Sequence, residues 1–352
     1  MFVPSASGSQ RPRADTCSKP PTCFQPPGHH RYGLTRRPES RQLLNATAVQ
    51  FTSRLLSRGL RQYLKFLWSQ GGRNIIINGT SGEFAAMTIA ERKQALEEAR
   101  SVWPGDQGGV EPCVLMNNVS STCLEEILEL LQHSEEQIST PRGQQARADA
   151  VLVLPPYYLA GVPEEGNAAF LRRVLAASSL PVYVYNFPAN TNCMVSPKLY
   201  AQLAQEFPNL RGVKNTFENT QLAKQFKDAA PQLQVYVGSD KLSVDTLKNG
   251  MDGVIGGGGS SAMAGPFVEI WHAHQRGDLK RARALQDIMD TWTAKREELG
   301  LLDIPAGKAA MQHHLPFLSP TCRPPLMPVP SSNIQMVHEA TAMALKAAQC
   351  LR

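Results

Sequence analysis

The chain has 352 residues, of which 42% are hydrophobic and 19% are charged, a composition typical of a soluble globular protein with a substantial core. No apolar run approaches the roughly 20 residues that a membrane-spanning helix needs. The formal net charge is +6, but residues 1–44 hold seven basic and two acidic residues and therefore account for +5 of it. Because the charge belongs to this tail and not to the body of the chain, neither a membrane-spanning nor a nucleic-acid-binding function is supported.

Residues 1–44 form a tail that is rich in Pro, Ser, Arg and Gln and has little periodicity. This composition is typical of a disordered or peripheral segment. An Arg-rich, acid-poor tail is also typical of an organelle transit peptide. We therefore expect a cytoplasmic protein, or a mitochondrial or plastid protein if the tail is a transit peptide.

Seven short apolar runs rich in β-branched residues follow, and amphipathic stretches separate them. The runs lie at residues 74–78, 113–117, 150–154, 181–185, 210–214, 233–237 and 253–255. Near-continuous apolar runs of this length are typical of strands buried on both faces of a parallel sheet. Between them, Thr88-Ile-Ala-Glu91 predicts a capping box that opens a helix to about Ser101, and Ser196-Pro197 predicts the start of another helix.

This alternation predicts an α/β fold, a (β/α)8 TIM barrel over residues 45–270, with a doubly wound open sheet as the alternative. The first strand is weak or missing. Residues 46–51 are its best candidate, ahead of a helix at about 53–70. After residue 270 the apolar residues recur at helical spacing, which predicts a C-terminal extension of two or three helices over 271–352 that packs on the barrel or on a partner subunit.

Lys214 ends one of the predicted strands, and Tyr185 ends the strand before it. A lysine at the end of a buried strand is partly stripped of water, which disfavours the charged ammonium. A neutral amine there can attack a ketone and form a Schiff base. The two strand ends would place a phenol beside that amine, at the edge where barrels of this kind carry their active sites.

Four motifs, in this order and spacing, resemble the dihydrodipicolinate synthase/N-acetylneuraminate lyase family of Schiff-base, pyruvate-dependent class I aldolases. They are Gly79–Glu83, Tyr185–Pro188, Gly212–Lys214 and Asp252–Gly256, and Arg323–Pro328 resembles the C-terminal segment of the family. The resemblance covers roughly residues 60 to 350. It implies a lysine Schiff base at Lys214 with pyruvate, and a small 2-oxo acid or aldehyde as the other reactant. We expect no cofactor and no metal.

The resemblance also implies roles for the neighbouring residues. Tyr185 would be the acid/base phenol. Thr80 and Ser81 would hold the pyruvyl carboxylate with hydroxyl and backbone N–H groups. Tyr158 is similar to a family tyrosine that reaches into a neighbouring subunit and links Ser81 to Tyr185 as a proton relay, although Tyr157 beside it is an alternative. A homo-oligomer, a dimer or a tetramer, is therefore expected.

The residues around the second substrate depart from the family pattern. Asn190 stands where dihydrodipicolinate synthases carry an arginine for the carboxylate of their second substrate, and a neutral amide cannot form that charged fork. The Pro-Ala-Asn-Thr run around it is similar to 4-hydroxy-2-oxoglutarate aldolases, and the Tyr-Asn-Phe-Pro run before it to 2-keto-3-deoxy-sugar-acid aldolases. Thr216 is placed to bond a substrate hydroxyl, and Gly238 and Ile255 are expected to line the pocket with backbone groups.

The expected function is a class I aldolase or lyase that cleaves, or forms, a hydroxylated 2-oxo acid to give pyruvate and an aldehyde. One alternative is a 4-hydroxy-tetrahydrodipicolinate synthase, which joins pyruvate to aspartate semialdehyde in lysine biosynthesis. The other is a catalytically inactive relative that acts as a ligand-binding or assembly protein. The weak first strand motivates this last alternative, because a barrel without one strand would hold its site loosely.

Overall fold

Parallel strands and helices alternate along the part of the chain that the computed structural model describes, residues 44–46, 56–103, 113–139, 145–159 and 161–351. The chain divides into two units, residues 1–39 and 40–352, and the described residues all belong to the second. The predicted basic tail lies outside the described residues except for Leu44.

Seven parallel strands match the predicted apolar runs to within one residue at either end. They are β2 (Asn74–Ile77), β3 (Val114–Asn118), β6 (Ala150–Val153), β7 (Val182–Asn186), β8 (Leu210–Asn215), β9 (Gln234–Val237) and β10 (Gly253–Gly256). Two further strands, β4 (Ile138–Ser139) and β5 (Gln145–Ala146), form a separate antiparallel pair. The predicted strands of the sheet are therefore confirmed one by one.

A short strand, β1 (Leu44–Ala46), pairs in parallel with β2 on one side and with β10 on the other. The strand order is consequently that of a closed barrel, β1-β10-β9-β8-β7-β6-β3-β2, and it has none of the open edges of a doubly wound sheet. The stretch predicted for the first strand, residues 46–51, shares only Ala46 with β1, and its other residues lie outside the described part of the chain.

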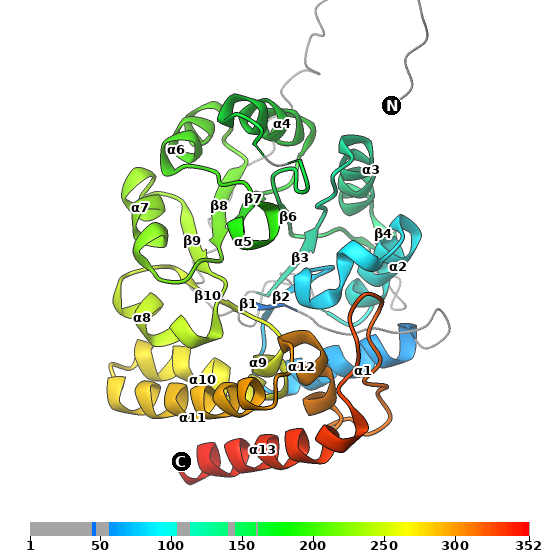
Figure 1. Ribbon diagram of the computed structural model, residues 1–352. Helices are drawn as coiled ribbons and strands as arrows, with labels where there is room; N and C mark the ends of the chain where they lie inside the picture. The colour runs from blue at the N-terminus through cyan, green and yellow to red at the C-terminus, as the bar shows by residue number, and fades with distance from the viewer. Residues whose placement is uncertain (1–43, 47–55, 104–112, 140–144, 160, 352) are drawn as a thin grey trace, which may run out of the picture. The chain divides into compact units, whose positions relative to one another are not determined.

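Helices follow the strands and surround the sheet, as Figure 1 shows. The predicted capping box is confirmed: Thr88 Oγ1 accepts a hydrogen bond from the backbone N–H of Glu91, whose carboxylate accepts one from the N–H of Thr88. Ser196 likewise caps the predicted helix that opens with Pro197. The helices that flank the strands are α1 (Leu56–Ser69), α2 (Ile89–Arg100), α3 (Leu124–Glu135), α4 (Glu164–Ala177), α6 (Pro197–Glu206), α7 (Gln221–Ala229), α8 (Ser243–Lys248) and α10 (Ala264–Gln275).

Side chains alternate along the strands between two buried layers. In β2, Ile75 and Ile77 belong to the large apolar cluster that includes the surrounding helices, whereas Ile76 belongs to a smaller cluster inside the barrel. In β7, Val184 belongs to the outer cluster and Tyr185 to the inner one. This alternation follows from the two-residue period of a strand, and it decides which side chains face the interior of the barrel.

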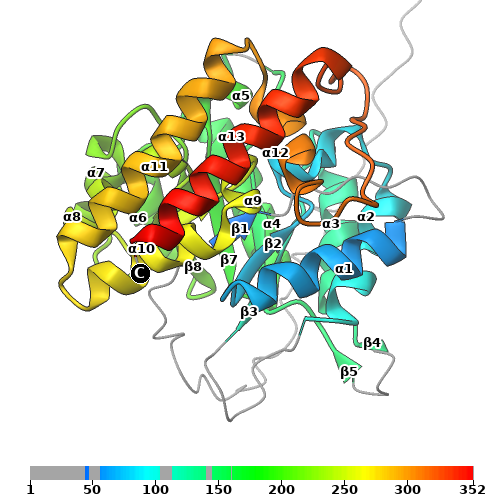
Figure 2. The ribbon, with the colours of Figure 1, turned by 90° about the horizontal axis from the view of Figure 1, so that it is seen from below.

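The C-terminal extension consists of α11 (Leu279–Glu298), α12 (Asp303–Met311) and α13 (Ser331–Cys350). Figures 1 and 2 show α11 and α13 side by side, and α12 packs against α13. The indole N–H of Trp292 donates a hydrogen bond of 3.1 Å to Thr341 Oγ1, which joins α11 to α13. The predicted C-terminal helices are confirmed, and within the described residues no helix is long and apolar enough to span a membrane.

Replacing Thr88 by alanine should lower the free energy of unfolding by about 1 kcal/mol, because it removes the hydroxyl that caps α2. Denaturant unfolding followed by circular dichroism measures this change. The control is Thr291→Ala in the interior of α11, which should stay within about 0.5 kcal/mol of the parent. An equal loss of unfolding free energy in both variants would show that the capping hydroxyl of Thr88 contributes no more than an ordinary helix threonine.

Candidate active site

Lys214 lies inside the barrel, between two tyrosines of the neighbouring strands. The strand register pairs it with Tyr185 of β7 and with Tyr236 of β9. Its side chain is buried, with 5% of the residue exposed, and its Nζ lies 4.0 Å from the centroid of the Tyr185 ring. The amine therefore stands next to a phenol, as the two strand ends predicted.

A cavity of about 330 Å³ opens over this lysine at the carboxyl ends of the strands. Seven of the predicted site residues line it together: Thr80, Ser81, Tyr185, Lys214, Thr216, Gly238 and Ile255. The volume lies within the range of small-molecule sites. The structure thus brings residues from five separate strand ends to one place.

Among the inward tyrosines, Tyr185 is the one that lines the cavity. The hydroxyl of Tyr183 donates a hydrogen bond to the side chain of Gln234, and burial raises its pKa above the ordinary value. Burial also raises the pKa of Tyr236 well above the ordinary value. The Tyr185 hydroxyl instead lies 3.4 Å from Oγ1 of Thr80, a residue that also lines the cavity.

Two glycines leave the space that the lysine and its neighbours occupy. A Cβ at Gly238 would lie 2.0 Å from Thr216 Oγ1 and 2.9 Å from Lys214 Cε. A Cβ at Gly212 would lie 2.6 Å from the Tyr183 ring. Thr216 Oγ1 is buried and has no hydrogen-bond partner among the described residues, which leaves it available to a ligand in the cavity.

The turn that carries Thr80 and Ser81 is a short 3₁₀ segment, η1 (Thr80–Gly82), directly after β2. Glu83 ends it in the left-handed region, with φ 60°, and its carboxylate is buried against Lys308 of α12. Glu83 does not line the cavity itself, although it ends the turn that does. Burial lowers the pKa of Lys308, and the Glu83 carboxylate opposes that shift.

Two predicted residues lie away from the cavity lining. The side chain of Tyr158 is 88% exposed, and its backbone has φ 76°. Asn190 lies in α5 (Pro188–Thr191) with an exposed side chain. Tyr157 is half-buried and packs edge-to-face on Phe84, with ring centroids 6.3 Å apart. The roles predicted for Tyr158 and Asn190 stay predictions.

The outer half of the cavity comes from residues that the sequence did not assign to the site. They are Phe187, Ser239, Asp240, Lys241, Gly256, Gly257, Thr293, Arg296, Asp303 and Ile304. The polar residue types at the ends of β9 and β10 were a usable signal for some of them. The last four belong to α11 and α12, and helical periodicity alone does not say which turn of a later helix reaches a barrel.

Asp240 is a carboxyl group in this outer half with an unusual environment. Burial and the nearby charge of Asp303 raise its pKa to about 7, while hydrogen bonds from Ser260 and from the backbone of Gly257 oppose the shift. Lys241, which also lines the cavity, forms an ion pair of 2.6 Å with Glu297. Asp240 therefore changes charge near neutral pH, and the cation beside it is already paired.

These observations define the class of the fold and the site: a parallel β/α barrel with a buried lysine, beside a phenol, in a cavity at the carboxyl ends of its strands. The Dihydrodipicolinate synthetase family model matches residues 41–344, and the chain belongs to that family. The predicted family is confirmed, and so, at the level of class, is the prediction of a carbon–carbon lyase.

Relatives with different substrates resemble the chain to similar degrees. It is 30% identical to the 2-dehydro-3-deoxy-D-gluconate/2-dehydro-3-deoxy-phosphogluconate aldolase of Thermoproteus tenax over 240 residues, 68% of this chain and 70% of that protein. It is 29% identical to the 4-hydroxy-tetrahydrodipicolinate synthase of Methanopyrus kandleri, over 64% of this chain and 70% of that protein. A crystal structure of the KD(P)G aldolase from T. tenax superposes with a TM-score of 0.73 at 26% identity, covering 87% of this chain and 99% of that chain.

The environment of Asp240 predicts a pH-dependent contribution to stability. Its pKa of about 7 in the folded chain exceeds the value of about 3.9 expected in the unfolded chain. The folded form therefore holds the extra proton between these values, so stability falls as the pH rises through this range. Asp240→Asn should raise the melting temperature by about 3 °C or more at pH 8 and change it little at pH 4.

Asp228→Asn is the matched control, because Asp228 lies on the surface in an exposed pair with Lys224. Scanning calorimetry at both pH values measures the two variants against the parent. A gain for Asp240→Asn that is the same at both pH values would contradict the titration.

Proposed function

We propose that the chain is a class I aldolase that cleaves a 4-hydroxy-2-oxo acid to pyruvate and an aldehyde through a Schiff base on Lys214. The observation that carries this proposal is the buried Lys214 amine, 4.0 Å from the Tyr185 ring, at the inner end of a cavity of about 330 Å³. An amine in this position can reach the ketone carbon of a small 2-oxo acid.

The reaction follows from these groups. The amine adds to the ketone carbon, and the Tyr185 phenol gives its proton to the departing hydroxyl, so that water leaves and a protonated imine forms beside a phenolate. The bond between carbons 3 and 4 breaks, its electron pair moves toward the imine nitrogen to give an enamine, and the hydroxyl on carbon 4 becomes the aldehyde carbonyl as it loses its proton. Tyr185 is placed to accept that proton and to return it to carbon 3. Water then releases pyruvate and restores Lys214.

The polar groups of the turn after β2 would bind the carboxylate of the substrate. Thr80 and Ser81 line the cavity, and Thr80 Oγ1 lies 3.4 Å from the Tyr185 hydroxyl. Thr216 Oγ1, buried and without a partner among the described residues, is available to a substrate hydroxyl. Unpaired groups of this kind favour a substrate that satisfies them.

Two alternatives receive less support. In a 4-hydroxy-tetrahydrodipicolinate synthase we expect an arginine for the second carboxylate, and here Asn190 is neutral and exposed. An inactive relative was suggested by the weak first strand, yet β1 pairs with both of its neighbours. The cytoplasmic location stays a prediction.

Incubation with pyruvate and borohydride should add the mass of a reduced pyruvyl group to one residue, Lys214, as identified by peptide mass spectrometry. Lys214→Arg should show no adduct, although the amine of Lys241 in the cavity lining is unchanged. Tyr185→Phe should still fold and form an adduct slowly, and should lose roughly 10²–10⁴-fold in aldehyde release. Trapping on a different lysine, or none on the folded wild type, would falsify the Schiff-base assignment.

Tyr158, 88% exposed in the single chain, is proposed to complete the site of a second copy in a homo-oligomer. Tyr158→Phe should then lower turnover by about tenfold or more with no change in melting temperature, because the lost hydroxyl is not buried in its own chain. Tyr157→Phe is the control, and sedimentation velocity gives the oligomeric state. Unchanged turnover would remove Tyr158 from the reaction.

A further inference from the structure

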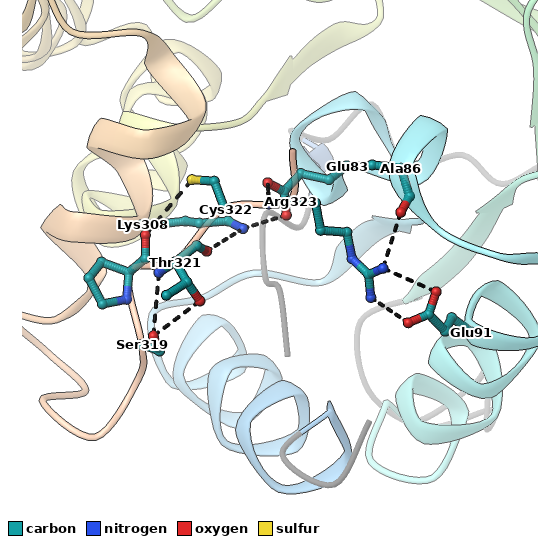
Figure 3. Close-up of polar contacts among 9 residues, drawn as sticks. Glu83, Ala86, Glu91, Lys308, Ser319, Thr321, Cys322 and Arg323 are labelled. Carbon is teal, nitrogen blue, oxygen red and sulfur yellow. Dashed lines mark hydrogen bonds and ion pairs between the residues drawn. The ribbon is translucent and has the colours of Figure 1, made fainter. Parts of the chain in front are cut away.

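A buried ion pair joins the turn after β2 to the C-terminal extension (Figure 3). Lys308 Nζ lies 2.5 Å from Glu83 Oε2, and the two side chains are 4% and 1% exposed. Lys308 also donates a hydrogen bond of 3.1 Å to the carbonyl oxygen of Thr321. The other oxygen of Glu83 accepts a hydrogen bond of 3.0 Å from the backbone N–H of Arg323. Two separate points of the C-terminal segment therefore hold one carboxylate.

Glu83 is covalently part of the turn that lines the cavity. Its backbone N–H donates a hydrogen bond of 2.9 Å to the carbonyl oxygen of Thr80, and its φ of 60° closes η1. A non-glycine residue is held in this region only where its surroundings determine the conformation. The next residue, Phe84, is buried in the inner cluster of the barrel. The position of Glu83 thus sets the direction in which Thr80 and Ser81 present their polar groups.

A second anchor fixes the far end of the same loop. The guanidinium of Arg323 donates hydrogen bonds to the Ala86 carbonyl, at 3.1 Å, and to both carboxylate oxygens of Glu91, at 3.1 and 2.6 Å. Figure 3 shows the guanidinium directed toward both partners. The hydrogen bond from Arg323 is the main reason that the pKa of Glu91 is lowered. The segment from Glu83 to the capping box of α2 is therefore tied to the C-terminal segment at both ends.

Helix α12 also contributes residues to the cavity lining. Asp303 and Ile304, in its first turn, line the outer half. Its approach is close, since a Cβ on Gly307 would lie 2.5 Å from the backbone of Gly258. Lys308 follows directly. One short helix therefore contributes to the cavity lining and also contacts, through Lys308, the turn after β2.

Burial of a whole ion pair removes two charges from water, so such a pair gives little net stability compared with apolar side chains of the same volume. What it does supply is direction, because a carboxylate held by an ammonium and an N–H group has one preferred orientation. Because Glu83 directly follows η1, its orientation affects the positions of Thr80 and Ser81, which line the cavity.

We propose that Lys308 is a positioning residue for this active site: by holding Glu83, it orients Thr80 and Ser81 toward the carboxylate of the 2-oxo acid. This role rests on the proposed function, because the 2-oxo acid is the ligand proposed there. The anchoring of the turn can be tested separately, without a catalytic assay. Lys308 itself does not line the cavity and takes no part in the proposed proton transfers.

The first test compares Lys308→Met with the parent in borohydride trapping at increasing pyruvate concentrations. The half-saturating pyruvate concentration should rise by about tenfold or more, with a smaller change in the maximal rate, because Lys214 and Tyr185 keep their places. Lys308→Arg should lie between the two, since it keeps the charge. Lys224→Met, which breaks the exposed pair with Asp228, is the matched control and should equal the parent.

The double variant Glu83→Gln/Lys308→Met separates positioning from stability. The double variant leaves no uncompensated buried charge. Its melting temperature should therefore be higher than that of either single variant and closer to that of the parent. The half-saturating concentration should nevertheless stay raised, because the contact that orients the turn is gone. If pyruvate binding recovers together with the melting temperature, Lys308 is merely structural and the proposal is overturned.

Hydrogen–deuterium exchange gives a readout that does not depend on the reaction. In Lys308→Met, the amides of residues 79–87 should exchange faster than in the parent, and those of 210–216 should be unchanged. Equal exchange at 79–87 would overturn the anchoring. If the wild type forms no pyruvyl adduct at all, the proposed function fails, and this measurement still decides whether Lys308 holds the turn.

Discussion

Everything at this site depends on the strict alternation of side chains along parallel strands. The same period that sends Val213 of β8 outward to the helices sends Lys214 inward, between Tyr185 and Tyr236. A shift of one residue in β8 would place the amine under a helix and a valine in the cavity. The surrounding glycines then make room: without a side chain at Gly238, the end of the lysine fits beside Thr216.

The alternating fold could be read from the sequence because its strands are buried on both faces and are therefore almost continuously apolar. Asn74–Ile77 shows this clearly, and Thr88 and Ser196 marked their helix starts through capping chemistry that is local in sequence. β1 was poorly predicted for the opposite reason. With three residues, it owes its place to pairing with β2 and β10, and such pairing leaves little trace in composition.

The inner half of the site was predictable and the outer half was not. Lys214, Tyr185 and Thr80 sit at strand ends, where topology alone brings them together. Arg296 and Asp303 come from helices whose docking depends on packing between distant segments. Tyr158 is a different case, because its side chain is exposed to solvent in a single chain. Neither the sequence pattern nor the structure of one chain therefore shows what surrounds it.

The ion pair between Glu83 and Lys308 spans 225 residues of sequence, and this separation has a consequence for biosynthesis. A ribosome completes every barrel strand, through Gly256, before it reaches α12. A nascent chain that has been made only as far as α11 therefore already contains Lys214, while part of the cavity wall and the anchor of the turn after β2 are still absent. The segment that completes the cavity around Lys214 is thus translated after all of the barrel strands.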